Sequence, residues 1–276
     1  MRLTQMLIAA AAMLAIGTSV SNAQQKSTWE TIQENKMVRV GCVNGEPFAY
    51  KDPASGEWKG IVPAFAALIA KEMEVDWECV ETTWGTAVAG LQANQFDFVG
   101  GLDATPQRAM AIDFAPGTLV YYAMAILARK DLPVENWSDL NKPEITAGVP
   151  LGTSSDRILT DLLDKAQFNR AKGNPEAVAA FASNRTDFIA GSSVWLTMQN
   201  HALGDQGKVV VPKPALISTA DVGIRREEDK RWRDWLGVSL SYFYWKGSIK
   251  QAYEEFLEFR GINAKSAPGI RLQELQ

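Results

Sequence analysis

Apolar and polar positions recur along the chain with two different periods, one typical of strands and one typical of helices. The short apolar run 38–43 is typical of a buried strand, whereas the apolar positions of 61–73 recur about every 3.6 residues, which predicts a helix. The same pattern predicts strands at 75–80 and 96–100 and helices at 84–93 and 105–110. Strands and helices that alternate in this order predict a mostly parallel sheet covered by helices.

A second set of strands and helices follows the continuous apolar run at 120–128. Its predicted elements are strands at 145–149, 187–190, 209–211 and 221–225 and helices at 155–165, 175–182, 193–201, 229–245 and 248–259. Two α/β units joined by more than one crossover would leave a cleft between them, and ligands bind at the carboxyl ends of open parallel strands. The pattern therefore predicts an α/β fold, and the chain length fits two lobes or a single barrel.

Residues 1–23 have the layout of a secretory signal peptide. Arg2 precedes an apolar run at 6–16, and small residues follow at 21–23. The run is about eleven residues long, whereas a membrane-spanning helix needs roughly 20. We therefore expect cleavage after Ala23 and a freely diffusing mature protein that starts near Gln24, in the periplasm of a Gram-negative cell.

Charge and residue types exclude some function classes. The formal net charge is −4, and loss of Arg2 with the leader makes it one unit more negative. This sign disfavours a general role in nucleic-acid binding. Two cysteines and one histidine cannot build the usual zinc sites, so we expect no bound metal and no cofactor.

Cys42 and Cys79 each lie near the end of a strand-like run, with one helical segment between the two runs. Parallel neighbouring strands would bring them close together. Two interpretations stay open: both are small buried hydrophobic side chains, or they form a disulfide in an oxidising compartment.

The common catalytic signatures are absent. The sequence contains no H-E-x-x-H, G-x-S-x-G, G-x-x-x-x-G-K-[ST] or G-x-G-x-x-G. His201, the only histidine, lies at the end of a helical pattern, where the helix dipole favours a positive charge. We interpret it as part of a helix terminus rather than as a base, and we expect that the protein is not an enzyme.

Several segments together resemble a known family. They are, in order, VRVGCVNGEPFAY, EWKGIVPAFAALIAKEM, TTWGTAVAGLQANQFDFVGG, ATPQRAMAIDFA, GVPLGTSSD, NRTDFIAGS and SYFYWKGSIKQAYEEF. Their order and spacing are similar to those of periplasmic solute-binding proteins of ABC importers, of the polar-amino-acid-binding type known as bacterial extracellular solute-binding protein family 3. Nearly the whole mature chain takes part in the resemblance.

The resemblance implies a two-lobed periplasmic binding protein fold, in which each lobe is a mostly parallel sheet flanked by helices and a two-strand hinge joins the lobes. We expect residues 24–121 and 219–276 in lobe 1 and residues 122–218 in lobe 2. The implied function is the capture of a small polar carboxylate-bearing solute, an amino acid or derivative, by hinge closure. The implied partners are this ligand and the membrane permease of an ABC transporter, and the protein is expected to be a monomer.

The resemblance also assigns ligand-binding residues. The arginine of the T-x-x-R stretch, here Arg108, would hold the ligand carboxylate through a two-pronged charge-assisted hydrogen bond. Trp84 would form an aromatic wall for the ligand, and Gly101 is also expected to be a ligand-binding residue. Thr153 and Ser154 match a segment whose backbone N–H groups at a helix start suit an anion. The alternatives are a solvated arginine, a core tryptophan and a plain N-cap at Ser154.

The departures from the family pattern leave the ligand's amino group without its usual partner. The family places an acid five residues beyond the aspartate that corresponds to Asp187, but this chain has Ser192. Asp103 and Glu46 are acids where the family tends to have other residues. Either acid would replace the missing partner, or the ligand carries no α-ammonium group; Glu46 would otherwise be a solvated loop acid. The enzymatic alternative is a secreted lyase or dehydratase on the same fold, with Asp103 or Glu46 as general acid or base.

Overall fold

The computed structural model describes residues 26–275, and the predicted signal peptide 1–23 lies outside the described residues. One half of the structure, here called the β1 half, is built around β1 (Met37–Val43). This strand pairs in parallel with β4 (Asp76–Thr82) on one side and with β5 (Phe98–Leu102) on the other. Parallel neighbours need crossover segments, which α2 (Ile61–Met73) and α3 (Ala87–Gln92) supply.

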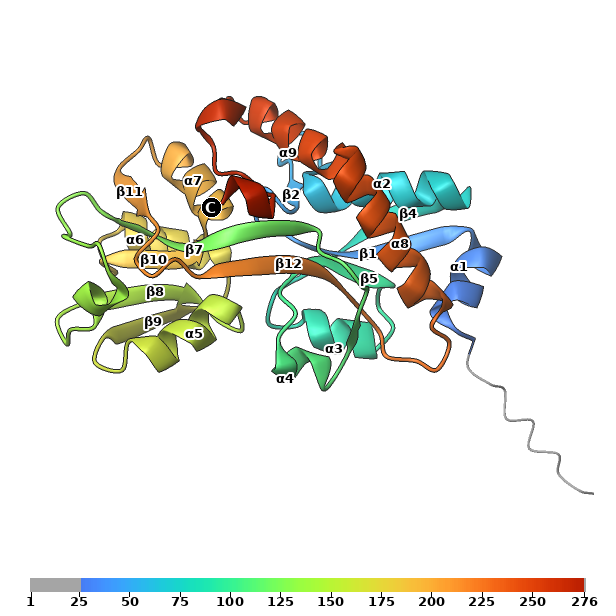
Figure 1. The fold of residues 1–276 in the computed structure, drawn as a ribbon, viewed down its shortest axis with the longest axis horizontal. Helices are drawn as coiled ribbons and strands as arrows, with labels where there is room; N and C mark the ends of the chain where they lie inside the picture. Colours follow the sequence, from blue (N-terminus) through green and yellow to red (C-terminus); the bar gives the residue numbers. More distant parts are fainter. Residues whose placement is uncertain (1–25, 276) are drawn as a thin grey trace, which may run out of the picture.

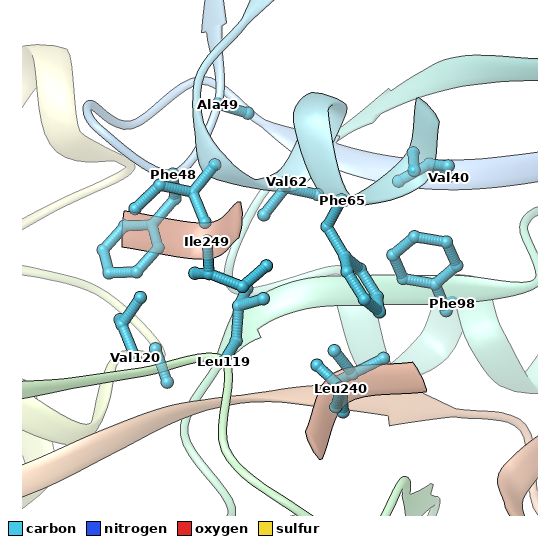
Figure 2. Close-up of a cluster of buried hydrophobic side chains, with 14 of the residues drawn as sticks. Val40, Phe48, Ala49, Val62, Phe65, Phe98, Leu119, Val120, Leu240 and Ile249 are labelled. Atoms are coloured by element: carbon cyan, nitrogen blue, oxygen red, sulfur yellow. The ribbon is translucent and has the colours of Figure 1, made fainter. Parts of the chain in front are cut away.

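Two hydrophobic cores hold the β1 half together, one on each face of its sheet. α2 packs with α8 (Arg231–Lys246) and α9 (Ser248–Phe259) on one face, where Phe65, Phe98 and Leu240 belong to the larger core (Figure 2). α3 covers the opposite face, with Leu91 and Phe96 in the smaller core (Figure 1). Burial on both faces explains why β5 is apolar along its whole length.

The other half, here called the β8 half, repeats the same principle. β8 (Thr146–Pro150) pairs in parallel with β9 (Gln167–Ala171) and with β10 (Phe188–Ser192). The helices of this half are α5 (Ser154–Leu162), α6 (Asn174–Ala182) and α7 (Ser193–Ala202). Two further cores lie on the two faces of its sheet, one around Leu159 and Phe188 and one around Phe181 and Leu196.

Two long strands connect the halves. Residues 120–123 of β7 (Val120–Arg129) pair antiparallel with residues 217–220 of β12 (Ile217–Ile224). Beyond this stretch β7 pairs with β10 and β12 pairs with β5, so the sheet runs in the order β4-β1-β5-β12-β7-β10-β8-β9 (Figure 1). The lobe boundaries expected at 121/122 and 218/219 fall within these two strands.

The predicted α/β class and most of the predicted elements are confirmed, with several additions. β12 begins at Ile217, four residues before the predicted start, because its first part pairs with β7. β9 was not predicted, since only Ala171 of this edge strand is buried. The helix predicted at 105–110 is α4 (Pro106–Ala109), and the strand predicted at 209–211 is β11 (Gly207–Val210). Elements that were not predicted are α1 (Thr28–Asn35), β2 (Tyr50–Lys51), β3 (Trp58–Lys59), β6 (Asp113–Phe114) and the 3-10 turns η1 (Trp137–Leu140), η2 (Ala264–Ser266) and η3 (Leu272–Glu274).

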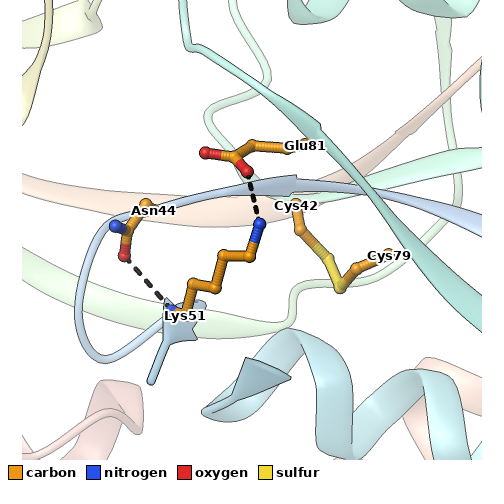
Figure 3. Close-up of a disulfide and its surroundings, with 5 residues drawn as sticks. All are labelled: Cys42, Asn44, Lys51, Cys79 and Glu81. Atoms are coloured by element: carbon orange, nitrogen blue, oxygen red, sulfur yellow. Dashed lines mark hydrogen bonds and ion pairs between the residues drawn. A yellow bond between two sulfur atoms is a disulfide. The ribbon is translucent and has the colours of Figure 1, made fainter. Parts of the chain in front are cut away.

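Cys42 and Cys79 form a disulfide between β1 and β4, with their Cα atoms 5.5 Å apart (Figure 3). Of the two interpretations of these cysteines, the disulfide is therefore confirmed, although Cys42 is also fully buried. The parallel register places Val40 opposite Cys79. Beside the disulfide, Lys51 Nζ donates to Glu81 at 2.9 Å, which adds a surface link between β2 and β4.

Candidate functional site

A cavity lies where the two halves meet, and side chains from both halves line it. The space that it offers to the centres of water molecules is about 70 Å³. All eight residues that the sequence analysis assigns to ligand binding line this cleft cavity: Glu46, Trp84, Gly101, Asp103, Arg108, Thr153, Ser154 and Ser192. The structure thus brings the predicted residues together, and their role in binding stays a prediction.

Arg108 lies on the short helix α4, whose N-cap is Thr105. The Thr105 hydroxyl accepts the backbone N–H of Arg108 at 3.2 Å. The guanidinium donates to the Asp103 carbonyl at 2.9 Å and, across the cleft, to the Gly152 carbonyl at 3.0 Å. Burial lowers the pKa of Arg108 and the nearby charge of Asp103 opposes this effect. Arg108 is therefore a half-buried arginine that bonds across the cleft rather than a fully solvated one.

Asp103 lies between β5 and α4, and its carboxylate joins the two halves. Its Oδ2 accepts the Tyr122 hydroxyl at 2.8 Å and also accepts the Ser154 hydroxyl of the β8 half. Burial raises the pKa of Asp103, whereas both hydrogen bonds and the charge of Arg108 oppose the rise. Burial and the Asp103 charge also hold the pKa of Tyr122 well above its ordinary value, so the phenol keeps its proton and remains a donor.

The N-terminus of α5 forms the opposite wall of the cavity. Thr153 is the N-cap, because its hydroxyl accepts the backbone N–H of Asp156 at 3.2 Å. The alternative of an N-cap at Ser154 is wrong: Ser154 is the first residue of the helix, and its side chain bonds Asp103 instead. The first N–H groups of a helix lack partners within the helix and attract anions.

Trp84 and Phe48 form an apolar wall over Gly101. Gly101 has a φ of +80°, and a Cβ built on it would lie 3.1 Å from the Phe48 ring and 3.3 Å from the Trp84 ring. Glycine is therefore required both by the backbone conformation and by the close approach of the two rings. Trp84 also packs against the smaller core of the β1 half, so it is both a core residue and a lining residue of the cavity, and its contact with a ligand stays a prediction.

Glu46 is not the solvated loop acid of the alternative interpretation, because it is only 8% exposed. Arg260, which directly follows α9, donates through Nε to Glu46 Oε2 at 3.1 Å. The guanidinium of Arg260 also lies 5.0 Å from the centroid of the Tyr50 ring. Burial raises the pKa of Glu46, and the charge of Arg260 opposes the rise.

The wall that the β8 half contributes contains no charged side chain among the described lining residues. Ser192 is the N-cap of α7 and accepts the Trp195 backbone N–H at 3.3 Å. The sequence analysis missed Phe48, Tyr122, Asn174 and Trp195, which also line the cavity. Asn174 is the first residue of α6 and precedes Pro175. Proline near a helix start is visible in the sequence, and this helix start follows the end of β9, so the signal could have pointed to Asn174.

Other kinds of site are not found in the described part of the chain. Across residues 26–275, no three side chains of the metal-binding types gather into one group. None of the helices in that range is both long and apolar enough to cross a membrane. His201 is exposed in the last turn of α7, which agrees with its assignment to a helix terminus.

Residues 38–259 match the bacterial extracellular solute-binding proteins, family 3. The chain belongs to this family. A curated relative of this solute-binding protein is the probable amino-acid ABC transporter periplasmic-binding protein y4tE of Sinorhizobium fredii (strain NBRC 101917 / NGR234), which is 24% identical over 201 residues. The match covers 67% of the chain and 62% of the relative, so the chain spans less than two thirds of that protein.

Solved structures of two-lobed binding proteins have the same fold. The ancestral amino acid-binding protein AncCDT-1, a precursor of cyclohexadienyl dehydratase, is 28% identical with a TM-score of 0.74, and the match covers 83% of this chain and 99% of that one. The solute receptor for L-cysteine of Neisseria gonorrhoeae is 20% identical with a TM-score of 0.76, covering 87% and 98%. The predicted two-lobed periplasmic binding protein fold is thus confirmed.

Proposed function

We propose that this solute-binding protein captures a small carboxylate-bearing solute, an amino acid or derivative, and presents it to the membrane permease of an ABC importer from the periplasm. The observation that carries the proposal is the approach of Arg108 and the α5 N-terminus to one cavity from opposite halves. A guanidinium and free helix N–H groups are two different receptors for the same planar anion. The family name supports solute binding, and the names of the relatives support the amino-acid class.

Capture involves closure of the two halves about β7 and β12. The side-chain hydrogen bonds that cross the cleft among the described residues run between two short segments, 103–108 and 152–157. They are the bonds of Asp103 with Ser154 and of Arg108 with Gly152, and a bond of 2.7 Å between the Arg157 guanidinium and the Gln107 side chain. A ligand that touches both segments favours the closed arrangement through contacts that neither half makes alone.

Asp103 is the proposed partner of the ligand's ammonium group. Glu46 is already neutralised by Arg260, and the β8 half brings no acid to the cavity. The Asp103 carboxylate has only hydroxyl donors at Oδ2, so it still carries a charge that a cationic donor can match. Asp103 then supplies from the β1 half the contact that Ser192 cannot supply.

The size of the cavity restricts the solute. About 70 Å³ of space for water centres corresponds to roughly five to seven water molecules at about 10–15 Å³ each. This space suits a small amino acid and not an extended peptide or a sugar chain. The lyase or dehydratase alternative is not favoured, since the family and the relatives above are named for binding.

The test is a thermal-shift screen of amino acids, amines and small organic acids, followed by calorimetry. A ligand that binds only the native state raises its stability by RT ln(1 + [L]/Kd). Loss of one partner from a buried ion pair costs about 3–5 kcal/mol, so Arg108→Ala should weaken binding by roughly two to three and a half decades at ~1.4 kcal/mol per decade.

Arg231→Ala is the matched control, because Arg231 is half exposed and pairs with Asp229 and Glu30 away from the cavity. It should leave affinity unchanged. Full affinity in Arg108→Ala would overturn the proposed site, and a chemical change in the bound solute would restore the enzymatic alternative.

A further inference from the structure

The cleft cavity contains three charged side chains among its described lining residues, and all of them come from the β1 half. They are Glu46, Asp103 and Arg108. A fourth charged side chain, Arg260, is not among the lining residues, but its Nε lies 3.1 Å from Glu46 Oε2. The two acids of the cavity, Glu46 and Asp103, are therefore matched by two cations only when Arg260 is counted with Arg108.

Low exposure and fixed contacts hold Glu46 and Arg260 together as an ion pair. The Glu46 side chain is only 10% exposed and that of Arg260 is 28% exposed, so water screens the pair only in part. Arg260 is held by the Tyr50 ring and by the end of α9, whose Phe256 and Leu257 carbonyls accept its backbone N–H. A buried carboxylate without such a partner is costly.

We propose that Arg260 determines the charge of the solute that the cleft cavity accepts. The inference rests on the proposed function. With the pair intact, the cavity presents one cation and one anion, Arg108 and Asp103, which match a zwitterion that has no further charge. Removal of Arg260 leaves the buried Glu46 carboxyl without its cationic partner, so an amino acid with a positively charged side chain can take the place of Arg260 beside it. Removal of the Glu46 charge leaves the Arg260 guanidinium without its partner, which favours an amino acid with a negatively charged side chain.

The experiment is calorimetric titration of the full mature chain with the twenty common amino acids and ornithine as probes. The wild type should bind at least one neutral amino acid at least tenfold more tightly than lysine, ornithine or glutamate. Arg260→Gln should shift the lysine-to-neutral affinity ratio at least tenfold toward lysine. Glu46→Gln should shift the glutamate-to-neutral ratio in the other direction, and the double variant should return to the neutral preference.

Three further variants separate charge from structure. Arg260→Lys keeps the charge and should keep the wild-type preference. Arg260→Met keeps contact with the Tyr50 ring without the charge, and it replaces Arg260→Gln in the experiment if that variant does not fold. Arg271→Gln is the matched control, since Arg271 lies 5.6 Å from the Tyr244 ring and bonds the Tyr244 carbonyl but contacts no acid of the cavity. It should leave all ratios unchanged.

The outcomes distinguish the inference from the function on which it rests. A neutral amino acid bound by the wild type, with ratios that do not move in Arg260→Gln, Arg260→Met and Glu46→Gln, overturns the inference and leaves the function standing. A wild-type protein that binds lysine or glutamate more tightly than every neutral amino acid also overturns the inference and leaves the proposed function standing. Absence of binding to every probe in every variant overturns the proposed amino-acid function and the inference with it.

Discussion

Asp103→Asn removes the charge of the side chain that lies between the two halves and keeps its size. An asparagine carbonyl can still accept the hydroxyls of Tyr122 and Ser154, which now bond Asp103 Oδ2. A hydrogen bond to a charged group contributes about 1.5–3 kcal/mol. If Asp103 holds the ligand's ammonium, the substitution should therefore weaken binding by roughly one to two decades at ~1.4 kcal/mol per decade.

The same substitution should change the stability of the ligand-free protein in the opposite direction. Burial raises the pKa of Asp103 in the folded state, against the facing charge of Arg108 and with a further contribution from Asp221. A raised carboxyl pKa means that the folded state binds the proton more readily than the unfolded state, so ionisation destabilises the fold above the folded pKa. Asp103→Asn should thus be more stable than the wild type at pH 7, and the difference should shrink as the pH falls toward about 3.9, the ordinary aspartate value.

Urea unfolding of both proteins between pH 3.5 and pH 8, together with calorimetry at pH 7, measures both effects. The difference between the two proteins cancels the titration of other carboxyl groups, such as Glu46 and Asp113, which both proteins share. A variant that binds an amine-bearing ligand as tightly as the wild type does would show that Asp103 is not the ammonium partner. A stability difference that stays constant across this pH range would contradict the assigned cause of the pKa shift.

Substitutions at three other places test the supports of the site. Cys42→Ser with Cys79→Ser opens a link across 37 residues of sequence, and the chain-entropy model predicts a loss of about 4 kcal/mol in urea unfolding; an unchanged midpoint would contradict it. Thr153→Ala removes the α5 N-cap and should cost about 1 kcal/mol, while Thr153→Ser should recover most of it in the same assay. Gly101→Ala forces a left-handed conformation on alanine, at roughly 1–2 kcal/mol, and pushes the Phe48 and Trp84 rings; full stability and full ligand affinity would show that the wall tolerates a methyl group.

The fold could be predicted well because its signals are local. α2 and α9 have the predicted bounds, since their apolar faces cover a sheet and their termini coincide with a change in composition. Short strands with few buried residues could not be predicted in this way, although the short helix α4 was predicted. The edge strand β9 is held by pairing with β8 rather than by its own apolar pattern, and pairing partners are not visible in a local window.

Residues of the candidate site could be named only through the resemblance to a family, and this explains which were missed. Tyr122 lies in the apolar run 120–128 and reads as a core residue, although its hydroxyl faces Asp103. Arg260 is 214 positions from Glu46, so no spacing rule connects them. Both omissions concern partners of acids that the sequence had already singled out, because hydrogen-bond partners depend on tertiary structure while the acids stand out by residue type.

The division of charge between the halves has a consequence for the energetics of capture. The charged receptors lie on the β1 half, and the wall of the β8 half offers a helix N-terminus and neutral polar groups. In an open cleft the charges act through water and are weak, whereas exclusion of water strengthens each of them. The bonds of Arg108 with Gly152 and of Asp103 with Ser154 use the same groups that a zwitterion would use. In the proposed closure, a solute stabilises the closed arrangement only by the amount that its bonds to Arg108, Asp103 and the α5 N-terminus in the closed cleft exceed these protein–protein bonds and its bonds in the open cleft, which favours ligands that present both charges at once over ligands that present one.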